Sequence, residues 1–149
     1  MRRFEMRSAR WLAAGVAAVG FMALGHAGMA TETEDAVVLN VDEVSAKVGE
    51  KATLVAKVTF KDGFKVADAY RNRVSSLSAE DNAVDFDNPA VRGVVQDNAL
   101  VFKIRVTPKQ PGAHAINGVL RVAFVNTLDG DYHLEIKTVP LVATVTGTQ

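Results

Sequence analysis

Alternation of apolar and polar residues is the feature that most constrains this chain. Between Leu100 and Val125 two such runs follow each other, separated by the turn-forming segment 108–112. Side chains on a β-strand point alternately to opposite faces, so a period of two places the apolar residues of each run on one face. The two runs predict a half-buried β-hairpin. Their apolar residues are Leu100, Phe102, Ile104 and Val106, then Ile116, Leu120, Val122 and Phe124.

Further short strands are predicted before and after this hairpin. Residues 52–60 alternate in the same way, with Leu54, Ala56, Val58 and Phe60 on one face. The dipeptide Asp62-Gly63 follows and predicts a second hairpin, because glycine accepts positive φ without steric cost. A short helix is an alternative only around residues 77–82. Because no segment carries a long helical period, the series of short strands predicts an all-β, two-sheet antiparallel sandwich.

Residues 1–30 have the three-part layout of a secretory signal peptide. Four arginines give a basic start, residues 11–24 are uncharged and apolar, and small residues end at Ala30. We expect cleavage after Ala30, with a cut three residues earlier as the alternative. An uncleaved anchor is disfavoured because the apolar run is shorter than the roughly 20 residues that a spanning helix needs. The predicted localisation is the periplasm, with secretion as the alternative.

Removing this leader changes the composition of what remains. The leader holds four of the seventeen Lys and Arg, one of the seventeen Asp and Glu, all four methionines and the single tryptophan, so residues 31–149 carry a net charge near −3. A mildly acidic domain without a basic run is a poor nucleic-acid binder, because phosphate neutralisation needs clustered Lys and Arg. The chain contains no cysteine, which excludes disulfides, thiol chemistry and lipoprotein attachment.

About 119 residues are enough for one domain with its own core. We expect residues 31–43 to form a short polar N-terminal segment with one short strand at 37–41, and residues 44–149 to form the sandwich. Pro140 interrupts the predicted C-terminal strand. Because proline cannot donate to a ladder, its presence there is typical of an edge strand or a bulge.

Several short motifs together resemble a known family. They are Val48-Gly49-Glu50, the strand from Leu54 to Phe60, Asp62-Gly63-Phe64-Lys65-Val66 with Tyr70, Thr107-Pro108-Lys109, Gly112-Ala113-His114 and the run from Gly118 to Val125. These motifs are similar to the immunoglobulin-like N-terminal domain of the periplasmic thiol:disulfide interchange reductases, over residues 44–145. The resemblance implies an immunoglobulin-like sandwich, export, and a partner-docking surface at one end.

The redox cysteines of that family are missing here. In the family a pair of cysteines flanks the loop after the strand that corresponds to the one ending near Phe124. The matching positions, near Asn126 and near Tyr132 or His133, carry no sulfur. Thiol–disulfide exchange requires a thiolate, so a cysteine-less relative cannot perform it.

The loop that follows Phe124 is the predicted functional site. It must reverse the chain into the next strand, and a tyrosine at a loop end is a common interface contact. The candidate partner-binding residues are Asn126, Asp129, Asp131, Tyr132 and His133.

Motifs for other kinds of site are absent from the sequence. His114 and His133 are expected at opposite ends of the sandwich, too far apart to share one ion. Segments 85–88 and 129–131 lack the ligand spacing of an EF-hand loop and indicate turns. Neither G-x-S-x-G nor H-E-x-x-H occurs. We therefore predict no enzymatic activity, no cofactor and no metal.

The predicted function is that of an exported, non-enzymatic immunoglobulin-like domain that binds a periplasmic or envelope protein without thiol redox activity. The alternative is a small-ligand or metal-binding periplasmic carrier on the same fold. Neither nucleic-acid binding nor a membrane span after signal cleavage is expected.

Overall fold

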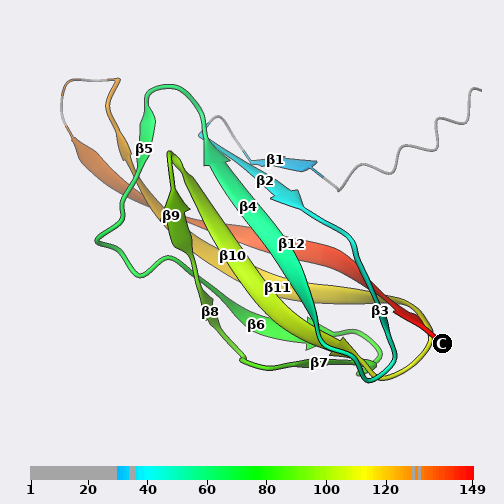
Figure 1. Cartoon of the computed structure of the whole chain (residues 1–149). Helices are drawn as coiled ribbons and strands as arrows, with labels where there is room; N and C mark the ends of the chain where they lie inside the picture. Colours follow the sequence, from blue (N-terminus) through cyan, green and yellow to red (C-terminus); the bar gives the residue numbers. More distant parts are fainter. Residues whose placement is uncertain (1–29, 34–35, 129, 131) are drawn as a thin grey trace, which may run out of the picture.

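The computed structural model describes residues 30–33, 36–128, 130 and 132–149. The predicted signal peptide lies outside these residues, apart from Ala30, and so do Asp129 and Asp131. The described part of the chain contains twelve strands and no helix, arranged as two facing sheets (Figure 1). This confirms the predicted all-β sandwich.

Each of the two sheets contains six strands. The first sheet consists of β1 (Ala30–Thr33), β2 (Val37–Val41), β4 (Ala52–Phe60), β7 (Val84–Phe86), β9 (Val94–Gln96) and β10 (Ala99–Pro108). The second sheet consists of β3 (Val44–Lys47), β5 (Phe64–Val66), β6 (Arg73–Ala79), β8 (Val91–Arg92), β11 (Gly112–Asn126) and β12 (His133–Thr148).

The strand order is that of an immunoglobulin-like sandwich. The first sheet runs β1-β2-β4-β10-β7, with β9 also on β10, and the second runs β3-β12-β11-β6-β8, with β5 also on β11. The series β2, β4, β10, β7 matches strands A, B, E and D of the immunoglobulin fold, and β6, β11, β12 match C, F and G. One ladder departs from the antiparallel expectation: β3 pairs with β12 in parallel, because the chain keeps its direction while it changes sheets between β2 and β3 (Figure 1).

The stretch from Leu100 to Val125 is not a hairpin, as the sequence predicted, but a crossing between sheets. Strand β10 pairs with β4 in the first sheet, whereas β11 pairs with β12 in the second. The apolar faces of β10 and β11 therefore meet across the core instead of lying side by side in one sheet. The crossing uses Pro111, which has no N–H for a ladder, and Gly112, whose φ is +104°.

The turn at Asp62-Gly63 is present, but the predicted hairpin between its flanking strands is wrong. Gly63 has a φ of +90°, and the N–H of Phe64 donates to the carbonyl of Lys61 at 3.0 Å. Strand β5 then pairs with β11 and not with β4. The aromatic ring of Phe64 packs edge-on against Phe124 with 5.6 Å between centroids, which holds β5 against the second sheet.

The structure also corrects the alternative of a helix near Leu77 and the expected polar segment 31–43. Residues 73–79 form strand β6, so the alternative of a helix starting near Leu77 is wrong for this part of the chain. Strand β2 pairs with β4, and its Val37, Leu39 and Val41 are core residues. The expected polar segment 31–43 therefore contributes a core strand, and the sandwich begins upstream of residue 44.

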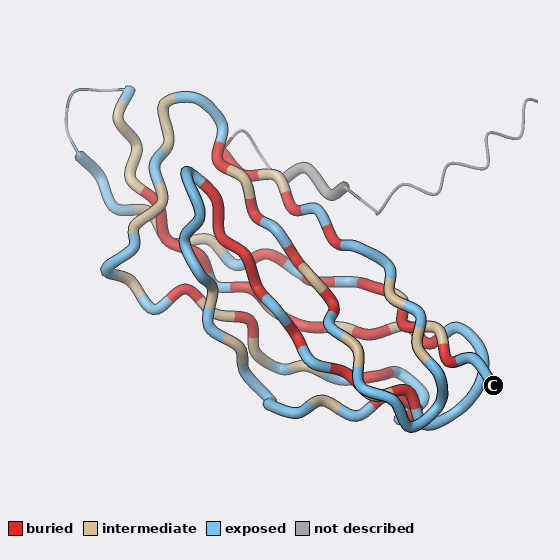
Figure 2. The backbone as a smooth tube through the Cα atoms, viewed as in Figure 1, coloured by how far each residue is buried: buried red, intermediate tan, exposed pale blue. Residues whose placement is uncertain are grey.

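The core lies between the two sheets, and its hydrophobic cluster in the described residues consists of aliphatic and phenylalanine side chains. Figure 2 shows buried positions alternating with exposed ones along the long strands. The inward set predicted for residues 52–60 is confirmed, since Leu54, Ala56, Val58 and Phe60 are all buried. The largest fully buried side chains are Phe102, Phe124, Leu54, Leu100, Ile104, Ile116, Leu120 and Leu141. Pro140 lies in β12 where no strand other than β11 pairs with it among the described residues, which agrees with the predicted edge position.

Asn72 fills a gap beside the central strand β11. Along one side, β11 pairs with β6 as far as Arg121 and with β5 from Phe124 onward. Between these ladders the N–H of Ala123 donates to Oδ1 of Asn72 at 2.7 Å, and the N–H of Ala67 donates to the carbonyl of Ala123 at 3.0 Å. The buried Asn72 side chain thus replaces a missing strand residue.

Asn72→Ala is expected to destabilise the domain by about 1–3 kcal/mol, because it leaves the buried N–H of Ala123 without an acceptor. Urea unfolding followed by circular dichroism measures the change. The control is Asn40→Ala on the exposed side of β2, which should stay within about 0.5 kcal/mol of wild type. Equal losses in the two variants would show that Asn72 has no special structural role.

Candidate functional site

The predicted loop joins β11 and β12 in one long hairpin. Asn126 pairs with His133 in the β11–β12 ladder, so the chain reverses here as expected. Oδ1 of Asn126 accepts the N–H of Leu128 at 2.9 Å, and the Tyr132 side chain is 81% exposed. The structure therefore brings Asn126, Tyr132 and His133 together at one end of the sandwich. The other two candidate residues, Asp129 and Asp131, lie outside the described residues.

The loop is attached to the turn between β4 and β5. Both the backbone N–H and the Oγ1 hydroxyl of Thr127 donate to the carbonyl of Gly63 at 2.8 Å. A Cβ at Gly63 would collide with the side chain of Leu128. Glycine is thus required at this turn twice, for its positive φ and for the close approach of the loop.

A third turn completes this end of the molecule. Asn98, between β9 and β10, accepts the N–H of Val66 at 3.1 Å and donates to the carbonyl of Phe64 at 2.8 Å. Its side-chain amide therefore pairs with β5 as a neighbouring strand would. A shallow groove of about 550 Å³ lies between these turns, with Asp62, Lys65 and Asp97 among its lining residues.

Strand β12 exposes an apolar stripe next to this loop. Leu134 is 58% exposed, Ile136 47% and Val142 49%, and the exposed Pro140 lies between them. We call Leu134, Ile136, Pro140 and Val142 the β12 stripe. All four point to the outer face of the second sheet, because they alternate with the buried residues Val139, Leu141 and Ala143.

The backbone edge beside the stripe is also free of a strand. In the described part of the chain, β12 pairs with β11 from His133 to Gly147 but with β3 only over Val145–Thr148. The segment from His133 to Thr144 therefore forms an edge of the second sheet. Figure 1 shows the β11–β12 hairpin extending at the end of the sandwich where β5 lies.

The sequence prediction missed the β12 stripe, although a signal for it exists. Leu134 and Ile136 occupy even positions, whereas Val139, Leu141 and Val145 occupy odd ones. The β11–β12 register is continuous over residues 133–147, with no bulge to change the phase. A change of phase within an unbroken strand means that one of the two apolar sets must point to solvent.

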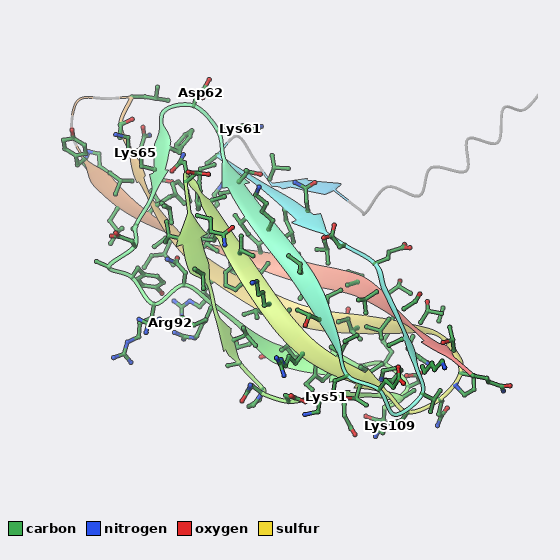
Figure 3. All side chains as sticks on the ribbon, in the orientation of Figure 1. Lys51, Lys61, Asp62, Lys65, Arg92 and Lys109 are labelled. Atoms are coloured by element: carbon green, nitrogen blue, oxygen red, sulfur yellow. The ribbon has the colours of Figure 1, made fainter. Side chains whose placement is uncertain are left out.

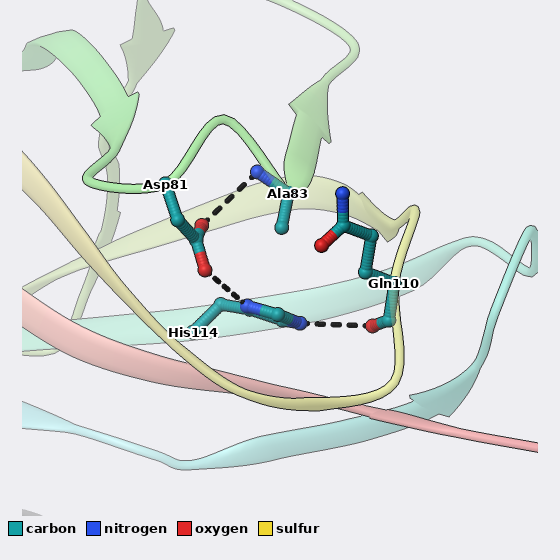
Figure 4. A network of polar contacts seen from close by, with 4 residues as sticks. All are labelled: Asp81, Ala83, Gln110 and His114. Atoms are coloured by element: carbon teal, nitrogen blue, oxygen red, sulfur yellow. Dashed lines mark hydrogen bonds and ion pairs between the residues drawn. The ribbon is translucent and has the colours of Figure 1, made fainter.

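At the opposite end, the buried His114 side chain forms a polar network with Asp81, whose side chain is half exposed (Figure 4). Nδ1 of His114 lies 2.6 Å from Oδ2 of Asp81, and Nε2 lies 2.8 Å from the carbonyl oxygen of Gln110. Both partners are acceptors, so both contacts are hydrogen bonds only when the imidazole carries two protons. Oδ1 of Asp81 also accepts the N–H of Ala83 at 3.0 Å.

This network shifts the protonation of both side chains in opposite directions. The hydrogen bond to Asp81, followed by the bond to the Gln110 carbonyl, raises the pKa of His114. The hydrogen bond from His114, followed by the Ala83 N–H, lowers the pKa of Asp81. The arrangement fixes the turn after β6 against the start of β11, which is a structural role.

The two histidines of the described residues do not lie together. His114 pairs with Val145 and His133 with Asn126, at opposite ends of β11 and roughly 40 Å apart at 3.4 Å per residue. Among the described residues, no group of three or more His, Cys, Asp or Glu side chains is arranged to hold a metal ion.

Comparisons with known proteins do not assign the chain to a family. No family model matches it, and no curated protein matches it in sequence. Among solved structures it is similar to AggA, the major subunit of aggregative adherence fimbriae type I from Escherichia coli, with 18% identity and a TM-score of 0.40 over 78% of this chain and 98% of AggA. With identity and TM-score this low, the likeness assigns no function. The described residues include no helix that could cross a membrane.

The His114 network makes stability depend on pH. Because the folded state holds the His114 proton more tightly than the unfolded state, its stabilisation is complete below the ordinary pKa of about 6.5 and is lost as the pH rises through the raised value. Asp81 acts in the opposite sense, losing its contribution as the pH falls below about 3.8. Urea midpoints of wild type should therefore fall between pH 6 and 9, and His114→Gln should flatten that slope.

The matched control for this experiment is His133→Gln, which changes an exposed histidine at the other end of the sandwich. It should keep the wild-type slope. A His114→Gln variant with the same slope as wild type would contradict the assigned network.

Proposed function

We propose that this chain is an exported, non-enzymatic domain that binds a periplasmic or envelope protein along the edge of β12 and the adjoining loop 126–133. The observation that carries the proposal is that one strand, β12, has both the exposed apolar stripe and a backbone edge that no other strand pairs with among the described residues. The stripe offers apolar surface to a partner, and the edge offers backbone N–H and C=O groups to an extended segment. The signal-peptide layout of residues 1–30 supports export.

The stripe can contribute a useful share of binding free energy. Fully burying a leucine or isoleucine side chain is worth about 1.5–3 kcal/mol. Leu134, Ile136 and Val142 are each about half exposed, so covering all three would contribute about 2–4 kcal/mol. Backbone hydrogen bonds to the edge add about 0.5–1.5 kcal/mol each. These terms suit a reversible complex, since association itself has a substantial entropic cost.

Pro140 limits which strands can add to this edge. It interrupts the row of backbone donors in the middle of the stripe, so two copies of β12 cannot pair without a break. Prolines on edge strands are one way in which β-proteins avoid pairing with themselves. The occupant we propose is therefore an extended segment of a different protein.

The resemblance to the N-terminal domain of the thiol:disulfide interchange reductases supports the same end of the molecule. It implies a docking surface at the loop that carries Asn126, Asp129, Asp131, Tyr132 and His133. Because the chain has no cysteine, the loop cannot transfer electrons by thiol–disulfide exchange. We therefore propose that it only binds the partner.

A photocrosslinking amino acid at Ile136 tests the proposal in cells. It should capture one defined envelope or periplasmic protein, which mass spectrometry identifies. The matched position is Val94 on β9 of the first sheet, which is 57% exposed and should not capture that protein. Capture of the same protein from both positions with equal yield would contradict the assignment of the site to β12.

Once that partner is identified, Leu134→Thr combined with Ile136→Thr should weaken its binding roughly 10-fold or more in calorimetry, because about half of the buried apolar area is lost. Threonine suits a strand and both positions are exposed, so unfolding stability should change by less than about 0.5 kcal/mol per site. Substituting alanine at Asp129, Tyr132 and His133 separates the contribution of the loop from that of the strand. Unchanged affinity in both variants would end the proposal.

A further inference from the structure

Three arginines stand in one row across the outer face of the second sheet. Arg121 on β11 is in register with Arg73 on β6, and Arg73 is in register with Arg92 on β8. Neighbouring strands lie about 4.8 Å apart, so the row spans roughly 10 Å. Arg71 precedes β6 by two residues. We call these three arginines, together with the adjacent Arg71, the arginine row.

No ion pair of the described residues involves a member of this row. The three ion pairs found in the described part of the chain involve Lys51, Lys109 and His114, and none of the four arginines takes part in one. The outward neighbours of Arg121 on β11 are Val119 and Ala123, and that of Arg73 on β6 is Ser75. Like charges directly opposite each other on adjacent strands are destabilising. The row therefore lowers stability, and no ion pair among the described residues offsets the repulsion.

Three members of the row surround a hollow. Arg71, Arg73 and Arg92, together with Ala90 and Val91, line a surface hollow of about 420 Å³. That volume lies within the range of small-ligand sites, which combine apolar surface with a few placed polar groups. Figure 3 labels Arg92 on the outer side of the sandwich, beside β8.

The backbone that carries these arginines is fixed from below by Asn72. Its Nδ2 donates to the carbonyls of Ala67 at 2.9 Å and Tyr70 at 3.3 Å, and its Oδ1 accepts the N–H of Ala123. The backbone carbonyl of Asn72 accepts the N–H of Gly93 at 2.9 Å, which ties the two strands together beside Arg92. A rigid base of this kind reduces the entropy lost when a ligand orders the side chains.

We propose that this hollow is a binding site for a phosphoryl group carried by a small ligand. Guanidinium groups bind phosphate oxygens through paired N–H bonds, and arginine is the preferred side chain for this task. A doubly charged phosphoryl group balances several cations at once, whereas a single carboxylate would leave most of the charge unpaired. The apolar Ala90 and Val91 would contact the uncharged part of the ligand. The residues that line the hollow belong to β6, β8 and the segments before them, and none of them belongs to the β12 stripe.

Calorimetric titration with pyrophosphate at 150 mM salt tests the site, because that salt concentration screens exposed charges more than about 8 Å apart. Wild type should bind one pyrophosphate saturably. Arg73→Gln and Arg92→Gln should each weaken binding roughly 10-fold or more, since each removes charged hydrogen bonds. Arg73→Lys keeps the charge and loses the paired hydrogen-bond geometry, so its affinity for pyrophosphate should lie between that of the glutamine variants and that of wild type.

The control is Arg105→Gln, which removes the same charge from an exposed position on β10 in the first sheet. It should bind pyrophosphate as wild type does. Absence of saturable binding, an equal loss in Arg105→Gln, or equally tight binding of succinate would overturn the proposal.

Thermal unfolding supplies a second readout that does not depend on calorimetry. Without ligand, Arg73→Gln should unfold at the wild-type temperature or above it, because it removes the central like charge of the row. Pyrophosphate should raise the unfolding temperature of wild type and not of the variant. An unfolding temperature that pyrophosphate raises equally in both proteins would also overturn the proposal.

Two sources can supply a phosphoryl group, a soluble phosphate ester or a phospholipid headgroup. Sedimentation with phosphatidate vesicles, compared with phosphatidylcholine vesicles, distinguishes them. Arg73-dependent sedimentation with phosphatidate alone identifies the headgroup as a source, and pyrophosphate binding without sedimentation identifies a soluble ester.

Discussion

The structure depends on backbone pairing along both sides of the central strand β11. On one side β12 pairs with all fifteen of its residues. On the other side the pairing is shared between β6, the side chain of Asn72 and β5. An unpaired backbone group at this depth would cost about 1–3 kcal/mol, so the loop between β5 and β6 must deliver Asn72 to Ala123. The same loop carries Arg71, which lines the proposed phosphoryl site.

The alternation in the sequence was sufficient to predict strands and their buried faces, but not the sheet to which each strand belongs. Leu100 to Val106 and Ile116 to Phe124 are buried as their period indicates. Their partners are set by contacts distant in sequence, and a period of two contains no information about them. The Asp62-Gly63 turn shows the same limit, because packing of Phe64 on Phe124 decides that β5 joins the second sheet.

The proposed sites were accessible from the sequence to different degrees. Turn residues predicted the reversal at Asn126 to His133 correctly. The β12 stripe could be predicted from the sequence, since Leu134 and Ile136 are out of phase with Val139 and Leu141 in one unbroken strand. The arginine row could not be predicted from the sequence. It forms only through the registers of β11 with β6 and of β6 with β8, which join residues up to 48 positions apart.

The proposed function requires that β12 presents an open edge beside its apolar stripe. Amide hydrogen exchange in the free protein measures this directly, residue by residue. From Thr138 to Thr144, where β12 pairs with β11 alone, every second amide should exchange rapidly. From Val145 to Thr148, where β3 pairs with the other edge, all amides should be protected. Uniform protection from Thr138 to Thr148 would show that the edge is already covered and would contradict the account.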